Sequence, residues 1–324
     1  MKAVIIEKFG GPEVLQYKEV PDPSLSSHDV LIRVSKTSVN YADIKNRNGN
    51  KGKGHFPLIL GLDLVGTIVK VGEGVDNLEI GQRVIAFPKT GSYAEYAVAT
   101  EQLTFPIPDT ISDEVAAASP IVTFLSYMLL KDVGRLIKGE TVLIHSAAGG
   151  VGTTAIQLAK LLGAKMVIGT VGNRQKMDVA RNAGADYVFT YDQFRKNTLE
   201  LTNGFGVDVI LDSMSGKVSE ESLECLAEYG RLVHFGNSSG GVGTFNTKAL
   251  HASCRSVLGF SLGNTRKKRP HLLIEAAAGV IPLLANGDLK MVIGAEYPLS
   301  KVAEAHQAIE NREHTGKILI DVTR

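Results

Sequence analysis

The chain has 324 residues, of which 44% are hydrophobic and 21% charged, and its formal net charge is +1. This length and composition predict a soluble globular protein of two domains. The near-zero charge disfavours nucleic acid and membrane surfaces as partners, and no apolar run is long enough to span a bilayer. Two cysteines, Cys225 and Cys254, form no disulfide framework, which predicts a reducing, cytoplasmic location.

Residues 1–120 have the pattern of a β-rich domain. Short apolar or alternating runs, separated by turns rich in glycine and proline, predict strands at 4–7, 30–34, 64–71 and 83–87. A helix is expected from Ser112, where Asp113 and Glu114 indicate a capped start. Helical patterning then continues from residue 124 to residue 137.

The stretch from residue 141 to residue 163 carries the clearest functional motif. An apolar run at 141–145 predicts a buried parallel strand, and Ala147, Gly149 and Gly152 follow at the spacing of the dinucleotide fingerprint, with alanine in its first position. Helical spacing follows, and Gly163 is the expected stop. This context predicts backbone N–H groups that approach a pyrophosphate at a helix N-terminus. The alternative is a tight turn whose small residues serve packing alone.

Strands and helices alternate from residue 141 to residue 260. Strands are expected at 141–146, 165–170, 186–191, 207–212, 231–235 and 256–260, and helices at 153–162, 175–183 and 219–228. This alternation predicts a six-stranded, doubly wound parallel sheet. The remaining chain offers helices at 272–284 and 300–311 and a strand at 317–322, which are expected to return to the N-terminal domain.

The residues after the second strand of this sheet bear on the choice of dinucleotide. An acidic residue there would select NAD, whereas no carboxylate appears before Asp178, inside the next helix. Arg174 and Lys176 stand where the 2′-phosphate of NADP would lie, and cations are not favoured at a helix N-terminus without an anion. The sequence therefore predicts NADPH. The alternative is that both residues are ordinary solvated charges.

Six motifs give the chain a family resemblance. They occupy residues 9–15, 39–43, 60–66, 147–152, 169–172 and 235–240. With them the chain resembles the zinc-independent quinone oxidoreductases, the zeta-crystallin-like branch of the medium-chain dehydrogenase/reductase superfamily. The resemblance implies a GroES-like domain built from residues 1–122 and 262–324, with a Rossmann domain inserted at 123–261. It also implies NADPH as cofactor, no metal, and a homodimer joined through the Rossmann domains.

The resemblance also assigns roles to individual residues. Lys176, Tyr191 and Arg312 would hold the 2′-phosphate, and Asn40, Thr123 and the segment 235–238 would line the nicotinamide. With the residues of the glycine turn and the following rim, the expected cofactor-binding set is Asn40, Thr123, Ala148, Gly149, Gly150, Val151, Gly152, Gly172, Arg174, Lys176, Tyr191, Phe235, Gly236, Asn237, Ser238 and Arg312.

The expected chemistry follows from the metal ligands that are missing. Relatives that bind zinc place a cysteine near Val39 or Asn40 and a His-Glu pair after the position of Gly61, where this chain has Leu62 and Asp63. Without a Lewis acid, reduction of an electron-poor acceptor is easier than alcohol oxidation. The hypothesis is hydride transfer from C4 of NADPH to a quinone or an activated α,β-unsaturated carbonyl.

Asn40 and Tyr41 are the catalytic candidates, because either side chain could hydrogen-bond a developing oxyanion. Tyr41 could equally be a half-buried packing residue, and Asp43 is expected to cap the helix that follows.

Two other functions remain open. One is reduction of enoyl thioesters or acrylate-like acids, which is weakened because the basic loop at 46–56 lacks the tyrosine that related enoyl reductases use. The other is a non-enzymatic NADPH-binding protein of the crystallin or RNA-binding kind. The lack of a basic, aromatic platform disfavours RNA.

Overall fold

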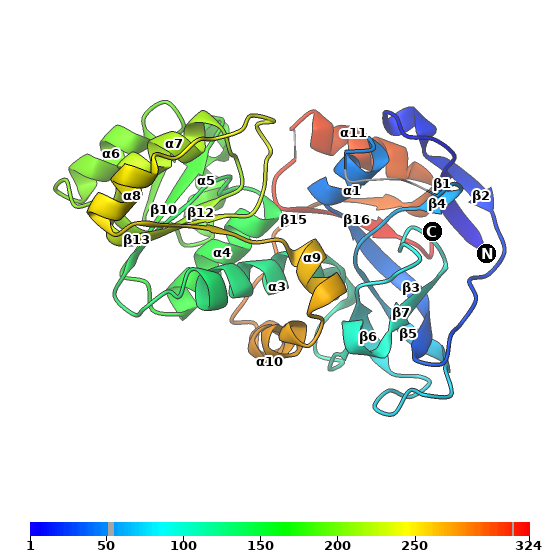
Figure 1. Cartoon of the computed structure of the whole chain (residues 1–324). Coiled ribbons are helices and arrows are strands. Elements are labelled where there is room, and N and C mark those ends of the chain that lie inside the picture. Colours follow the sequence, from blue (N-terminus) through cyan, green and yellow to red (C-terminus); the bar gives the residue numbers. More distant parts are fainter. Residues whose placement is uncertain (51–54, 313) are drawn as a thin grey trace. The chain divides into compact units, whose positions relative to one another are not determined.

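The computed structural model describes residues 1–50, 55–312 and 314–324, so Lys51 and Lys53 of the predicted basic loop lie outside the described residues. The chain forms two compact units, Met1–Val122 with Arg269–Arg324, and Thr123–Lys268 (Figure 1). Both chain ends therefore belong to one unit. Helix α9 (Leu262–Lys268), which the sequence analysis placed in the first domain, falls in the second unit because it follows directly from the last strand of that unit.

The first unit is built on two β-sheets. A seven-stranded sheet has the order β15-β16-β3-β5-β6-β8, with β7 also paired to β3, and a three-stranded sheet has the order β2-β1-β4. The strands are β1 (Lys2–Ile6), β2 (Gln16–Glu19), β3 (Asp29–Val39), β4 (Leu58–Ile59), β5 (Leu64–Val71), β6 (Arg83–Ala86), β7 (Tyr96–Thr100), β8 (Thr104–Pro106), β15 (Ile293–Pro298) and β16 (Lys317–Asp321). The antiparallel pairing of β16 with β3 sets Ile318 opposite Val39.

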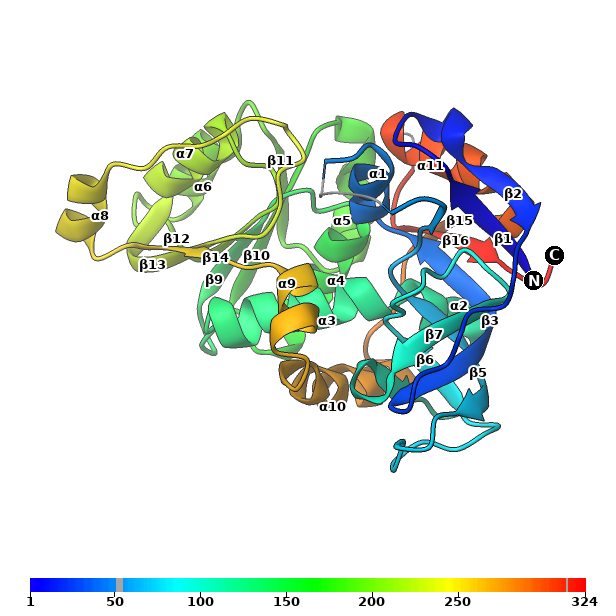
Figure 2. The same ribbon diagram turned by 45° about the vertical axis from the view of Figure 1, so that its right-hand side comes forward.

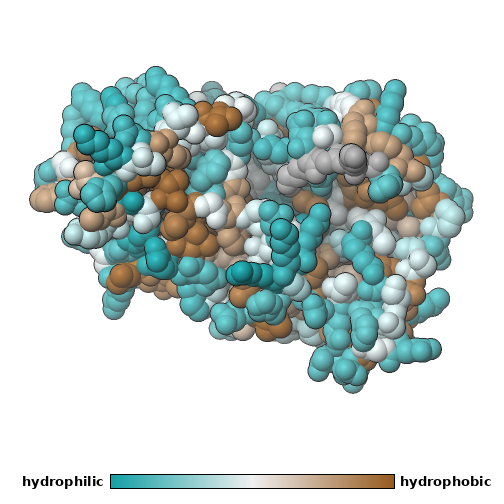
Figure 3. Space-filling view, viewed as in Figure 1, coloured by the Kyte–Doolittle hydropathy of each residue, from teal (hydrophilic) through white to brown (hydrophobic). Residues whose placement is uncertain are grey.

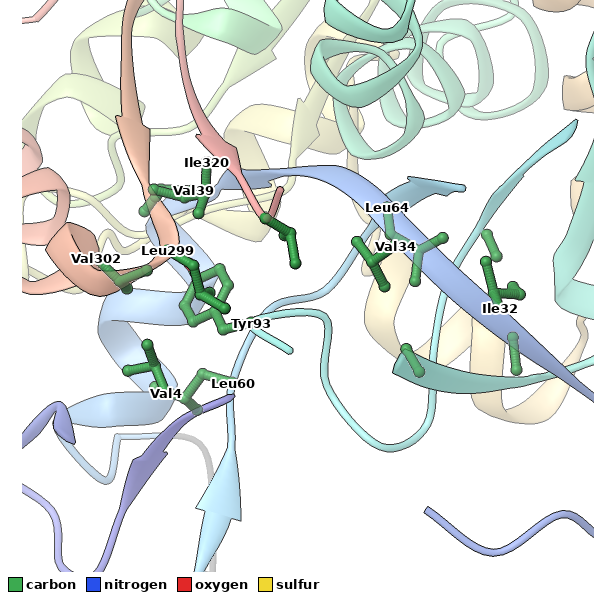
Figure 4. Packing of buried hydrophobic residues seen from close by; sticks show 14 of the residues in the cluster. Val4, Ile32, Val34, Val39, Leu60, Leu64, Tyr93, Leu299, Val302 and Ile320 are labelled. Atoms are coloured by element: carbon green, nitrogen blue, oxygen red, sulfur yellow. The ribbon is translucent and has the colours of Figure 1, made fainter. Parts of the chain in front are cut away.

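Two helices of the first unit, α2 (Asp113–Ala118) and α11 (Val302–Glu310), contact its seven-stranded sheet. Helices α1 (Tyr41–Arg47) and α10 (Leu272–Ala285) also belong to this unit, while α3 (Pro120–Met128) crosses into the second unit. Figure 4 shows Val4, Leu60, Tyr93 and Leu299 packed together in the core. Side chains from both ends of the chain thus complete one hydrophobic core, which is why the C-terminal segment folds back.

The second unit is a parallel sheet of the order β11-β10-β9-β12-β13-β14. Its elements are β9 (Thr141–Ile144), α4 (Gly150–Leu161), β10 (Met166–Val171), α5 (Met177–Asn182), β11 (Tyr187–Thr190), α6 (Phe194–Leu201), β12 (Val207–Asp212), α7 (Lys217–Glu224), β13 (Leu226–His234), α8 (Thr247–Ser253) and β14 (Ser256–Gly259). Helices cover both faces (Figures 1 and 2). The predicted six-stranded, doubly wound sheet is confirmed, and its order reverses between β9 and β12, where such folds bind ligands.

Two predicted boundaries were wrong. Residues 226–228, predicted as helix, belong to β13, because Leu226 pairs with Val207 of the neighbouring strand and is fully buried there. The helix predicted at 124–137 starts earlier, at Pro120, and its continuation ends at Val133. Proline is well suited to a first helical turn, since its missing N–H would have no partner there. No helix of the described residues is both long and apolar enough to cross a membrane.

Candidate cofactor and active site

The glycine turn connects β9 directly to α4, as the sequence predicts. Ser146 has a positive φ of 54°, and the N–H of Gly149 donates to its carbonyl oxygen at 3.0 Å, so the chain turns sharply. A Cβ at Gly152 would lie 2.3 Å from the Ser146 carbonyl oxygen and 2.6 Å from Ala147 Cα. Only glycine therefore permits this close approach of the helix to the end of the strand.

The N-terminus of α4 fits an anion. Gly149 is the N-cap residue and has no side chain to offer, while Thr153 and Thr154 donate their hydroxyl groups back to the carbonyl oxygens of Gly149 and Gly150. The first N–H groups of a helix have no partner within the helix, and the helix dipole favours negative charge there. A Cβ on Gly149 would meet only the Ser146 carbonyl oxygen, at 3.4 Å. The open space and the outward-facing donors fit the pyrophosphate of a dinucleotide.

Tyr191 and the two predicted phosphate-binding cations lie around the carboxyl end of β10. The N–H of Ser146 donates to Tyr191 Oη at 2.9 Å. A Cβ on Gly172 would lie 3.9 Å from the Tyr191 ring. Arg174 and Lys176 follow in a short 3-10 turn, Arg174–Lys176, that leads into α5. The structure thus brings Tyr191 beside Gly172 and the glycine turn. Both cations lie in the segment that follows Gly172 and leads into α5.

A cluster of hydroxyl groups joins the glycine turn to the predicted nicotinamide segment, 235–238. Ser213 Oγ donates to Ser146 Oγ at 3.0 Å. Met214 Sδ accepts from Ser146 Oγ at 3.3 Å and from Ser238 Oγ at 3.0 Å. The N–H of Ser238 donates to the Ser213 carbonyl oxygen at 3.0 Å. The two segments therefore converge at the carboxyl edge of the sheet, around Met214.

Asp212, the last residue of β12, organises this edge, and the sequence analysis did not single it out. Its Oδ1 accepts from the N–H groups of Met214 and Ser215, and its Oδ2 lies 3.0 Å from His234 Nδ1. Burial alone would raise the pKa of Asp212, but the hydrogen bond with His234 and further partners lower it to about 2. An aspartate directly after the apolar run 209–211 was the available signal.

Thr123, in the first turn of α3, has a fully buried side chain. Among the described residues, its Oγ1 is one of the few buried polar atoms without a hydrogen-bond partner. A buried hydroxyl group without a partner costs free energy, so a polar ligand atom is a fitting partner. The carboxamide of a nicotinamide has the required donor and acceptor.

Asn40, in the first unit, lies at the junction of β3 and α1 and is 6% exposed. Its Oδ1 accepts from Lys317 Nζ at 2.6 Å, and its Nδ2 donates to Asp63 Oδ1 at 3.1 Å. Asp63 Oδ1 also accepts from Ser38 Oγ at 2.8 Å. The amide is therefore held from both ends by the protein, and its orientation is fixed.

Asp43 lies below Asn40 in the first turn of α1. Its Oδ2 accepts from the N–H of Asn40 at 2.9 Å, as expected of a residue that caps this helix. Its Oδ1 is buried and, among the described residues, has no partner of good hydrogen-bond geometry. Burial, together with the nearby Asp63 charge, raises the pKa of Asp43 to about 7 although the Asn40 N–H and Lys317 oppose this. Burial also lowers the pKa of Lys317, against the two carboxylates.

Tyr41 differs from Asn40 in its exposure. The buried side of α1 carries Asp43, Ile44 and Arg47, whereas Tyr41 is 47% exposed, with Lys45 Nζ 5.3 Å from its ring centre. Its phenol is therefore accessible to a ligand, while the Asn40 amide already bonds Lys317 and Asp63. Arg312 is exposed and has a φ of 59°, just after α11 in the same unit.

Comparisons with known proteins agree with this architecture. The family model "Alcohol dehydrogenase GroES-like domain" matches residues 26–109, and "Zinc-binding dehydrogenase" matches residues 150–278. The quinone oxidoreductase of Salmonella typhimurium is 36% identical over 324 residues, with 97% of each chain covered. The chain belongs to the quinone oxidoreductase branch of the medium-chain dehydrogenase/reductase superfamily. The resemblance read from the sequence motifs is thereby confirmed.

Members of this branch from distant organisms show the same extent of similarity. Human quinone oxidoreductase is 32% identical to the chain, with 99% of this chain and 97% of the human protein covered. The crystal structure of Escherichia coli quinone oxidoreductase complexed with NADPH superimposes with a TM-score of 0.92 at 33% identity, covering 99% of this chain and 100% of that one. The GroES-like and Rossmann organisation is therefore shared over the whole length.

Proposed function

We propose that the protein is an NADPH-dependent oxidoreductase that reduces quinones by hydride transfer. The observation that carries the proposal is the N-terminus of α4, where Gly149 offers no capping side chain and Gly152 lets the helix approach the end of β9 closely. Ser146 in this turn and Ser238 in the segment 235–238 both donate to Met214 Sδ, so the two segments lie together. Membership of the quinone oxidoreductase branch and the NADPH complex of the Escherichia coli relative support the proposal. Activated α,β-unsaturated carbonyls share the electron-poor character of quinones, and we include them as substrates.

NADPH would supply the hydride, and the protein would bind and orient it. The glycine turn would hold the pyrophosphate, and the Thr123 hydroxyl would receive a polar atom of the nicotinamide. Lys176, Tyr191 and Arg312 would hold the 2′-phosphate. On the substrate side, the accessible Tyr41 phenol would donate a hydrogen bond to the oxygen that gains charge.

We also propose that the reaction needs no resident metal. At the positions where zinc-binding relatives carry ligands, this chain has an amide, an aliphatic side chain and a carboxylate. Both oxygens of that carboxylate, Asp63, accept hydrogen bonds from the protein, from Ser38 and Asn40 on one oxygen and from the Ile121 N–H on the other. A donor set of this kind does not suit a zinc ion.

A screen of acceptors tests the proposed function. The purified protein should oxidise NADPH in the presence of simple quinones or enones, and the same turnover should persist after treatment with a chelator. NADH, run beside it, should be used at least about tenfold less efficiently, since one charge-assisted contact is worth roughly 1.5–3 kcal/mol. Turnover of crotonyl thioesters but of no quinone would favour the enoyl reductase alternative instead.

The 2′-phosphate contacts give a second prediction. Lys176→Ala and Arg312→Ala should each raise the KM for NADPH by roughly tenfold or more and leave the KM for NADH nearly unchanged, because each removes a cation from the phosphate. Arg181→Ala, which removes an exposed cation paired with Asp178 in α5, is the matched control and should affect neither cofactor. Equal effects on both cofactors would show that the 2′-phosphate binds elsewhere.

We further propose a homodimer joined through β14. This strand is at the edge of its sheet, and its Val257 and Leu258 side chains are only half-buried. Figure 3 shows brown, apolar surface on the second unit, to the right of the place where α8 and β13 are labelled in Figure 1. An unpaired edge with apolar side chains favours pairing with a second copy. Light scattering in solution should give twice the mass of 34.7 kDa.

A further inference from the structure

Three buried ionisable side chains converge on Asn40. Lys317 Nζ donates to its Oδ1 at 2.6 Å, Asp63 Oδ1 accepts from its Nδ2 at 3.1 Å, and Asp43 Oδ2 accepts from its main-chain N–H at 2.9 Å. The three come from separate parts of the chain, namely the start of β16, the residue before β5 and the first turn of α1. All are at most 4% exposed.

Lys317 is the cation of this cluster. It donates to the Val39 carbonyl oxygen at 3.2 Å as well as to Asn40, so these two hydrogen bonds fix the end of β3 and the residue after it. The two carboxylates favour its charge, against the cost of burial. The amide of Asn40 lies between cation and carboxylate, and its dipole is aligned by both, with oxygen toward Lys317 and nitrogen toward Asp63.

The cluster also reaches α3. Asp63 Oδ2 accepts from the N–H of Ile121 at 3.2 Å, two residues before Thr123 in the same helix. The carboxylate that orients the Asn40 amide therefore also holds the first turn of the helix that carries the unpartnered Thr123 hydroxyl. Asn40 and Thr123 are the two residues outside the segment 235–238 that the family resemblance assigns to the nicotinamide.

Stability alone does not account for such a cluster. Removing ions from water costs several kcal/mol each, and well-packed apolar residues in place of a buried ion pair are often neutral or stabilising. Buried polar groups of this kind can instead impose one conformation on a site. Here that conformation is the orientation of the Asn40 amide and the start of α1.

We propose that Lys317 is a positioning residue for the nicotinamide half of the cofactor, which acts through Asn40 and Asp63 and makes no contact with cofactor or substrate itself. The inference rests on the proposed function, because it assumes that Asn40 and Thr123 face the nicotinamide. Its consequence is selective: loss of Lys317 impairs binding and use of the nicotinamide end and leaves binding of the adenosine phosphate end unchanged.

Two ligands separate these ends. NADPH contains both, whereas adenosine 2′,5′-bisphosphate carries the 2′-phosphate and no nicotinamide. For Lys317→Met, we expect the Kd for NADPH to rise at least tenfold and kcat to fall, while the Kd for the bisphosphate stays within twofold of wild type. NADPH fluorescence and calorimetry give these constants without turnover.

A matched control comes from the same sheet. Lys36, on β3, is 8% exposed and pairs with Asp321 and Glu296, so Lys36→Met also removes a buried cation. It should lower the melting temperature and leave both dissociation constants within twofold of wild type. If Lys317→Met does not fold, the variant Asp63→Asn tests the positioning role in its place. This substitution keeps the shape of the side chain but lets the amide of Asn40 reorient. It should raise the Kd for NADPH by a smaller factor than Lys317→Met and leave the Kd for the bisphosphate unchanged.

The outcomes separate the two proposals. A folded Lys317 or Asp63 variant that loses affinity for both ligands equally, or for neither, overturns the positioning role while the proposed function stands. A wild-type protein that binds neither NADPH nor the bisphosphate overturns the proposed function, and this inference with it.

Discussion

Replacing Gly152 with alanine should weaken NADPH binding by roughly 5- to 150-fold, since overpacking costs of about 1–3 kcal/mol are expected for a clash with fixed backbone. The new Cβ would lie 2.3 Å from the Ser146 carbonyl oxygen and 2.6 to 2.7 Å from main-chain atoms of Ala147. No flexible side chain can move away to relieve this contact. Helix α4 must instead shift from the end of β9, and its N–H groups leave the position that the pyrophosphate requires.

Substitutions at two further glycines distinguish a steric clash within the protein from a clash with the bound ligand as the cause of lost affinity. Gly149→Ala meets only one protein atom, at 3.4 Å, so it should fold normally and lose affinity only because its methyl group occupies the space of the pyrophosphate. Gly263→Ala, in α9 of the same unit, meets nothing closer than 3.9 Å and should affect neither stability nor binding adversely. NADPH fluorescence titration gives Kd, and circular dichroism checks the fold. Normal affinity in the Gly152 variant would refute the proposed site.

The glycine turn and the parallel sheet could be predicted because their signals are local. Apolar runs, small residues at fixed spacing and Gly163 after the helix lie next to one another in the sequence, and each has one physical interpretation. The C-terminal end of α7 was harder to place. Residues 226–228 continue a helical pattern, but pairing of Leu226 with Val207, which lies 19 positions earlier in the sequence, draws them into β13.

The substrate side could not be predicted to the same depth. Asn40 and Tyr41 were proposed together as hydrogen-bond donors, and they are neighbours in the sequence. The hydrogen bonds of the Asn40 amide come from Asp63 and from Lys317, the latter 277 positions away from Asn40. A lysine at the start of an apolar C-terminal strand gives no local sign that it will be buried against an asparagine. The structure leaves Tyr41 as the accessible donor and makes Asn40 the centre of a fixed cluster.

Acidification from pH 7.5 to pH 5 should destabilise the second unit by about 2 kcal/mol and leave the first nearly unchanged. In the second unit, burial lowers the pKa of His145 to about 4, below its ordinary 6.5. Its ring nitrogens lie 2.7 Å from Thr170 Oγ1 and from Ser222 Oγ, so a second proton would place a charge in a buried site whose direct hydrogen-bond partners are neutral hydroxyl groups. The unfolded chain takes up that proton first, so stability present above pH 6.5 is lost as the pH falls towards 4.

The first unit contains a similar histidine and an opposing acid. Burial, with the neighbouring Arg47, lowers the pKa of His306 to about 3, so its effect on stability has the same sign as that of His145. Asp43 acts in the other direction. Its pKa of about 7 exceeds the ordinary 3.8, so the folded state takes up the proton first and gains stability as the pH falls from 7 towards 3.8. Between pH 7 and pH 5 the two contributions are similar in size, about 2 to 3 kcal/mol each, and cancel.

Hydrogen exchange followed by mass spectrometry, at three pH values in mild urea, resolves the two units by their peptides. His145→Gln should remove the pH dependence of the second unit, since glutamine can accept from Thr170 and donate to Ser222 but does not titrate. Asp43→Asn should introduce a pH dependence in the first unit, because the stabilising protonation of Asp43 no longer offsets the destabilising effect of His306. The free energy of unfolding of that unit should then fall by about 2 kcal/mol at pH 5. Parallel loss of protection in both wild-type units would show that Asp43 does not carry a raised pKa in the folded protein.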